Sequence, residues 1–133
     1  MFDQSLIIGP DGLPNDNRPL LTAPGGGVSV AGTTPTDVSP VRSHFFGYLQ
    51  RLEAVCLVAG AAAGHWDLEN DDGVLDVLQQ PVNPSVVGTR LIWEFPTPLP
   101  STVGGALFVT PSVNMGTWFF TANGFFAPFG RVA

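Results

Sequence analysis

The chain has 133 residues, of which 44% are hydrophobic and 12% charged, and its formal net charge is -6. This length suits one domain with its own core, and so small a charged fraction indicates that a partner covers part of the surface. All five basic residues are arginines, and they are too scattered for the cation clusters that bind nucleic acid or an anionic membrane: Arg18, Arg42, Arg51, Arg90 and Arg131.

The first 41 residues differ in composition from the rest, and we expect them to form an extended N-terminal arm. They hold six of the 13 prolines and the glycine run at residues 25–27. Proline fixes φ and removes a backbone donor, which favours an extended path. A disordered tail is the alternative, but such segments usually lack apolar residues. We therefore assign contact with a partner to the apolar residues of the arm, which are Leu6, Ile7, Ile8, Leu20 and Leu21.

From residue 42 onward, short apolar runs are separated by turn residues. The runs are SHFFGYLQ, EAVCLVAG, HWDLE, VLDVLQ, TRLIWEF, ALFVT and TWFFT, and each has about the length of a strand. In TRLIWEF, Leu91 and Trp93 fall on one face, whereas Arg90 and Glu94 fall on the other, which is typical of a half-buried strand. We expect residues 42–133 to form an all-β, jelly-roll-like antiparallel β-sandwich.

One segment also fits a helix that begins after Ser43 as the N-cap. Five apolar residues there share one helical face, namely Phe45, Leu49, Leu52, Cys56 and Ala59. Gly47 and the β-branched Val55 and Val58 weaken this alternative, and the strand is favoured.

Five of the 11 acidic residues lie between residues 60 and 78, namely Asp67, Glu69, Asp71, Asp72 and Asp76. A calcium loop would need glycine one position before Gly73 and a closing glutamate, and neither is present. His65 has no second histidine or cysteine at ligand spacing. We therefore expect no bound metal.

An antiparallel hairpin explains the acidic stretch better. Trp66 and Leu68 would face the core, and the acidic residues would form the wet face and the turn. Gly73 would take the positive φ of the turn. On the returning strand, Leu75 and Val77 are predicted to face inward.

The sequence offers no catalytic constellation, and we expect neither enzymatic activity nor a cofactor. Ser43 and His44 are adjacent, so on a strand they point to opposite faces. The run APGGGV has no lysine and no following helix, which excludes a phosphate loop. Cys56, the single cysteine, lies in an apolar run and is expected to be a buried hydrophobe.

The C-terminal segment TWFFTANGFFAPFG is rich in aromatic residues. Asn123-Gly124 is the strongest two-residue hairpin signal in the chain. A domain of this size has one interior, so we expect some rings to be exposed at an interface; the alternative is that all of them pack inside or under the arm. The predicted partner-binding rings are Phe119, Phe125, Phe126 and Phe129.

Residues 51–121 resemble a family of β-sandwich virion proteins of tailed bacteriophages, many of which are capsid decoration or cement proteins. The resemblance is carried by RLEAVCLVAGAAAGHWDLENDDG, LIWEFPTPLPSTVGGALFV and GTWFF, although the turn ENDD is more acidic than the family's usual Gly, Thr and Ser. It implies a non-enzymatic protein that is made in the host cytoplasm. Such a protein would bind the major capsid protein on the phage head, often as a homotrimer.

Two alternatives remain open at this point. Within viruses, the chain could be a tail or head-fibre component. Outside them, it could be a carbohydrate-binding module, and exposed, coplanar Trp66 and Trp93 would favour that function.

Overall fold

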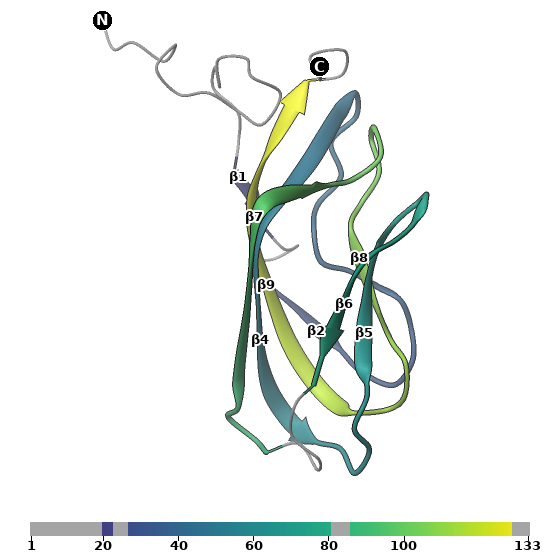
Figure 1. Ribbon diagram of the computed structural model, residues 1–133, viewed down its shortest axis with the longest axis vertical. Coiled ribbons are helices and arrows are strands. Elements are labelled where there is room, and N and C mark those ends of the chain that lie inside the picture. The colour runs from purple at the N-terminus through teal and green to yellow at the C-terminus, as the bar shows by residue number, and fades with distance from the viewer. Residues whose placement is uncertain (1–19, 23–26, 81–85, 129–133) are drawn as a thin grey trace, which may run out of the picture.

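The computed structural model describes residues 20–22, 27–80 and 86–128, and within these ranges every regular element is a β-strand (Figure 1). The strands are β1 (Leu20–Thr22), β2 (Val28–Val30), β3 (Thr36–Asp37), β4 (Phe45–Ala59), β5 (His65–Asn70), β6 (Gly73–Gln79), β7 (Arg90–Pro100), β8 (Phe108–Pro111) and β9 (Gly116–Pro128).

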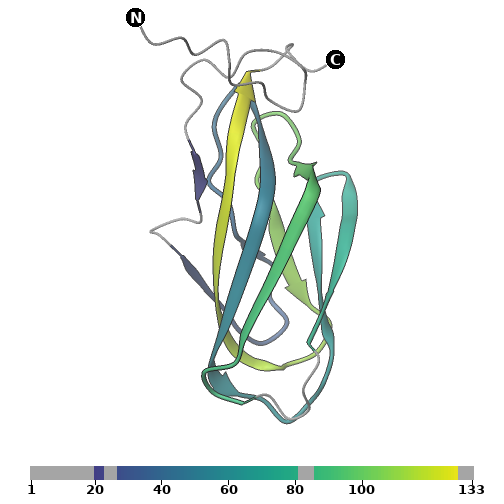
Figure 2. The same cartoon turned by 60° about the vertical axis from the view of Figure 1, so that its left-hand side comes forward.

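The strands form two antiparallel sheets that lie face to face, as Figures 1 and 2 show. The first sheet has the order β1-β9-β4-β7, and β2 also pairs with β9; the second has the order β3-β8-β5-β6. The predicted all-β class is confirmed. The jelly-roll-like connectivity stays a prediction.

The core between the sheets is built around Trp66 of β5, which is 1% exposed. Its ring meets Trp118 and Phe120 of β9 edge-to-face, with centroids 5.2 and 5.3 Å away. Trp93 of β7 also meets it edge-on, at 5.9 Å. This geometry sets the positive edge of one ring against the negative face of another, so aromatic contacts centred on Trp66 join the two sheets.

The segment that could have been a helix is the 15-residue strand β4. Leu52, Ala54 and Cys56 are buried, and the residues between them are more exposed, which is a period of two. β4 pairs with β9 on one side and with β7 on the other. The helix alternative is therefore wrong, because pairing on both edges overrides the helical spacing of the apolar residues.

The predicted acidic hairpin is confirmed as β5 and β6, with Asn70 opposite Gly73 and a φ of 138° at Gly73. Trp66 and Leu68 are buried as expected. The prediction that Val77 faces inward is wrong, since it is 44% exposed and Leu78 is buried instead. The register shifts after Leu68, and such a bulge breaks the period of two on β6.

Part of the predicted arm belongs to this two-sheet domain. β2 pairs with β9 and β3 pairs with β8. Val30 and Val38 are buried in the core between the sheets. The domain therefore includes residues 27–41, which precede the boundary predicted at residue 42.

Asn123-Gly124 does not form the predicted hairpin, because β9 continues through it. Asn123 pairs with Thr22 on one side and Arg51 on the other. Gly124 lies beside a bulge in β4, and a Cβ there would be 1.9 Å from the carbonyl oxygen of Tyr48. The glycine therefore permits a close approach of two strands and does not make a turn.

Candidate functional site

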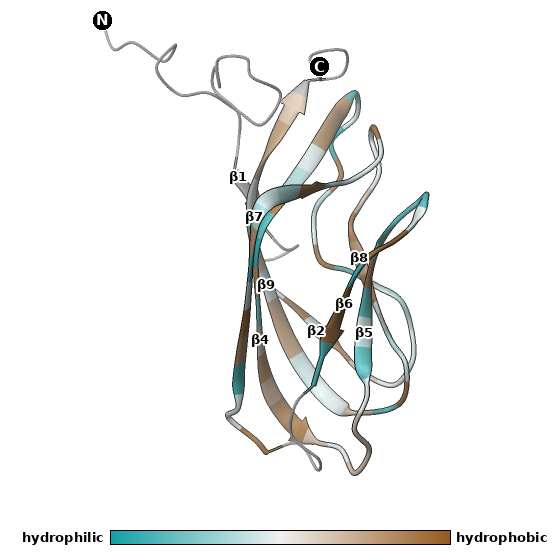
Figure 3. Cartoon of the chain, in the orientation of Figure 1, coloured by the Kyte–Doolittle hydropathy of each residue, from teal (hydrophilic) through white to brown (hydrophobic). Residues whose placement is uncertain are grey.

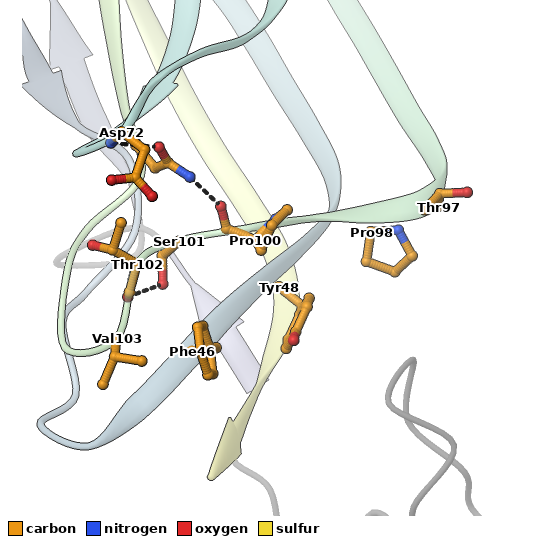
Figure 4. A pocket seen from close by; sticks show the side chains of 10 residues that line it. Phe46, Tyr48, Asp72, Thr97, Pro98, Pro100, Ser101, Thr102 and Val103 are labelled. Atoms are coloured by element: carbon orange, nitrogen blue, oxygen red, sulfur yellow. Dashed lines mark hydrogen bonds between the residues drawn. The ribbon is translucent and has the colours of Figure 1, made fainter. Parts of the chain in front are cut away.

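A hollow on the described surface lies where β7 bends away from β4. The β4–β7 register jumps from Arg51 opposite Glu94 to Leu49 opposite Leu99, so β7 has extra residues in between. Two of these are Pro96 and Pro98, which fix φ and lack a donor. The resulting open groove, of about 710 Å³, is called the proline groove and is lined by Phe46, Tyr48, Asn70, Asp72, Thr97, Pro98, Pro100, Ser101, Thr102 and Val103 (Figure 4).

Hydrogen bonds hold the walls of the proline groove in place. Asn70 donates from Nδ2 to the Pro100 carbonyl at 2.9 Å, and its Oδ1 accepts the Asp72 N–H at 2.8 Å (Figure 4). The Ser101 hydroxyl accepts the Gly47 N–H at 2.7 Å and donates to a neighbouring carbonyl. These polar groups have structural partners, so the walls of the groove are preformed.

The opposite end of the domain is apolar and uncharged. The chain segments that meet there, residues 57–64, 86–89 and 112–117, contain no charged residue. Val58 is 57% exposed and Val87 is 62% exposed, and Figure 3 shows the hydrophobic end of β4 in brown. We call this surface the apolar end, and its exposed large side chains are Leu57, Val58, Val86, Val87 and Val113.

A shallow hollow of about 490 Å³ adjoins the apolar end. Small residues line most of it, including Ala59, Ala61 and Ala62. β4 and β9 approach closely beside it, because a Cβ on Gly116 would be 2.0 Å from the Val58 carbonyl oxygen. The apolar end is thus a surface of small and branched side chains around a depression.

The charges of the described residues are divided between the two sheets. The three arginines, Arg42, Arg51 and Arg90, lie on or next to β4 and β7. Six of the eight acidic residues lie in the second sheet or its β5–β6 turn, namely Asp37, Asp67, Glu69, Asp71, Asp72 and Asp76. The outer face of the second sheet is therefore acidic, whereas ion pairs joining Arg51 and Arg90 to Glu53 balance the first.

Several chemical features bear on the predictions about metals, membranes and the cysteine. In the described ranges, no group of three or more His, Cys, Asp or Glu residues is placed to hold a metal ion. The same part of the chain has no helix long and apolar enough to cross a membrane. Cys56 is a buried free thiol, and its burial raises its pKa.

The structure places the predicted partner-binding rings mainly inside the domain. Phe126 packs in the core edge-to-face against Phe45, and Phe125 stacks on Tyr48 with centroids 5.4 Å apart. The expectation that these two rings are exposed is wrong, since they are 4% and 7% exposed. Phe119 is half-buried and packs against Gly27. The reason for expecting self-association through this segment is therefore lost.

Of the other predicted partner-binding residues, the structure describes two. Leu20 and Leu21 lie in β1, opposite Phe125 and Gly124 of β9. Leu6, Ile7, Ile8 and Phe129 lie outside the described residues. Their role in binding a partner stays a prediction.

Both candidate surfaces were missed by the sequence predictions. The proline groove joins residues near positions 47, 71 and 100, which only folding brings together. A signal for the apolar end was present, since CLVAGAAAG contains no charge and VVG follows a proline-rich stretch. Comparisons with family models, curated proteins and solved structures found no match to this chain.

Proposed function

We propose that the protein is a non-enzymatic virion structural protein, a decoration or cement protein that binds and stabilises the head shell of a tailed bacteriophage. Its partner would be the major capsid protein, on a jelly-roll-like scaffold. The apolar end is the observation that supports this most, because large exposed apolar patches mark protein interfaces.

The size of the apolar end limits the affinity with which it can bind a partner by itself. Burying the exposed halves of Leu57, Val58, Val86 and Val87 would contribute about 1 kcal/mol each. Association itself costs roughly 4–15 kcal/mol. One apolar end would therefore bind weakly, and attachment needs further contacts or several copies on a repeating surface.

The N-terminal segment would supply such contacts. Leu6, Ile7 and Ile8 form an apolar cluster within a proline-containing stretch. A segment of this kind can lie along another protein and add to the edge of a sheet there. Ordering it costs about 1–2 kcal/mol per residue, and proline lowers that cost by restricting the free chain.

Binding to shells assembled from the major capsid protein of the same genome tests the proposal. Val58→Asp and Val87→Asp should each reduce co-sedimentation with these shells at least tenfold, because an uncompensated charge would be buried. Val74→Asp is the matched control, since Val74 is also an exposed strand valine, 54% exposed, on the second sheet. Wild-type protein that fails to bind the shells, or equal losses in all three variants, would contradict the proposal.

The proline groove favours a second candidate, a tail or head-fibre component that binds a glycan. The half-buried Phe46 and the exposed Asp72 both line the groove, and sugar sites combine aromatic surface with polar groups. Trp66 and Trp93 do not provide the platform, because Trp66 is buried and their planes differ by 74°. Binding on a glycan array that is lost in Phe46→Ala would support this candidate; an array without hits would exclude it.

A further inference from the structure

β7 is an edge strand of the first sheet. It pairs with β4, and no strand of the described chain pairs with its other edge. Pro96, Pro98 and Pro100 interrupt the second half of β7, and such prolines protect a sheet edge from further pairing. Residues 90–95 lack this protection.

The backbone groups that face the free edge can be identified from one hydrogen bond. The Cys56 N–H donates to the Thr89 carbonyl at 2.9 Å, so this carbonyl points towards β4, and the N–H of Arg90 in the same trans peptide points away from β4. Direction alternates along a strand. The N–H and C=O groups of Arg90, Ile92 and Glu94 therefore point away from β4, towards the free edge.

The side chains of the same three residues share the outer face of the sheet. Ile92 is 45% exposed, and it lies between the positive Arg90 and the negative Glu94. If β7 pairs antiparallel with a second copy of itself about Ile92, then Arg90 lies opposite Glu94 of the second copy and Ile92 lies opposite Ile92. These three positions are also the ones whose backbone groups are free, so hydrogen bonding and charge select the same register.

The two neighbouring registers each fail at least one of these requirements. Centring the pair on Leu91 places Arg90 opposite Ile92, so no opposite charges meet. Centring it on Trp93 places Ile92 opposite Glu94 and sets Arg90 against Pro96, which has no N–H to donate.

The charges of β7 are available for this contact. Glu94 is exposed and makes no ion pair or side-chain hydrogen bond within the described chain. Arg90 donates from Nε to Glu53 Oε1 at 2.7 Å. A guanidinium has five N–H donors, so Arg90 can keep Glu53 and also reach Glu94 of the second copy.

The other edges in the described chain are less suited to self-pairing. β6 has a bulge next to Leu75 and an exposed Asp76, and both features oppose edge-to-edge association. β1 and β2 have three residues each, and β3 has two. β7 is therefore the longest regular edge whose charges complement a second copy.

We propose that the protein forms a two-fold symmetric dimer in which β7 pairs antiparallel with β7 of a second copy, centred on Ile92. The dimer joins the two first sheets into one continuous sheet. It does not depend on binding to a phage shell, and it differs from the trimer that the family resemblance implies.

Charge reversal tests the register directly. Glu94→Arg should place like charges opposite each other at both ends of the pair and raise the dimer dissociation constant at least tenfold in sedimentation velocity. Arg90→Glu should do the same. Mixing the two variants should restore association as a heterodimer, because one chain is then acidic and the other basic at both positions. Asp76→Arg, a charge reversal at an exposed position of β6, should leave the wild-type constant unchanged.

Amide exchange gives a second measurement that does not rely on mutation. The N–H groups of Arg90, Ile92 and Glu94 should exchange slowly in concentrated wild-type protein and quickly on dilution. A wild-type monomer at 200 micromolar, a trimer, or a mixture of the two variants that stays monomeric would each overturn the proposal.

Discussion

Gly116 and Gly88 offer a matched test of how closely β4 and β9 approach. Both have a φ of 89°, a value that favours glycine. A Cβ on Gly116 would lie 2.0 Å from the Val58 carbonyl oxygen and 2.7 Å from the Gly60 nitrogen, whereas a Cβ on Gly88 would meet nothing within 4 Å. Substituting alanine at each position therefore changes the backbone preference equally and the steric contact unequally.

The expected costs follow from that difference. Positive φ in a non-glycine residue costs about 1–3 kcal/mol, and the alanine's smaller unfolded-state entropy offsets about 0.4–1 kcal/mol of it. Gly116→Ala adds an overlap with backbone, and overpacking costs about 1–3 kcal/mol more. The free energy of unfolding should thus fall by about 1–3 kcal/mol more in Gly116→Ala than in Gly88→Ala.

Urea unfolding followed by tryptophan fluorescence measures this difference, since Trp66 and Trp118 are buried reporters. With a slope of about 2 kcal/mol per molar urea, a difference of 2 kcal/mol moves the midpoint by about 1 M. Equal midpoints for the two variants would refute the reasoning, because the two sites share a φ of 89° and differ in the space around the added methyl group. An unfolded Gly116→Ala beside a folded Gly88→Ala would agree with it.

Three further results are expected. Trp66→Ala should lower the free energy of unfolding by about 3–5 kcal/mol in urea, because it empties the centre of the aromatic core; a loss under 1 kcal/mol would contradict that packing. Asn70→Ala should lower the free energy of unfolding by about 1–3 kcal/mol in the same measurement, because the Asp72 N–H and the Pro100 carbonyl lose their partner. Unchanged stability would mean that these two hydrogen bonds do not stabilise the turn. Cys56 should resist thiol reagents until the protein unfolds, and fast labelling of the native protein would contradict this. Because burial raises the pKa of the folded-state thiol, its contribution to stability is present at neutral pH and is lost as the pH rises above the pKa of the unfolded thiol.

Local sequence patterns were sufficient to predict those elements that depend mainly on their own residues. The alternation in residues 89–95 predicted the two faces of β7, because one face packs on the core and the other meets solvent. The β5–β6 hairpin was predictable for a similar reason, since Asn70 and Gly73 carry the turn chemistry themselves.

Contacts between segments far apart in the sequence determined the features that local patterns did not predict. Asn123-Gly124 has the composition of a turn, but strands on both sides of β9 keep it extended. Phe125 and Phe126 could not be assigned to the interior from sequence, because Tyr48 and Phe45, which cover them, lie far away in the chain.

The candidate surfaces show the same division. Sequence by itself determined that the chain is all-β, poor in charge and free of an obvious catalytic motif. Only the tertiary structure brought the β4 aromatics, the β5–β6 turn and the β7 prolines into one groove, and left one edge of β7 without a partner among the described strands. The physical reason is that a strand's pattern specifies which face it buries, whereas its neighbours and its free edge depend on how every other strand is packed.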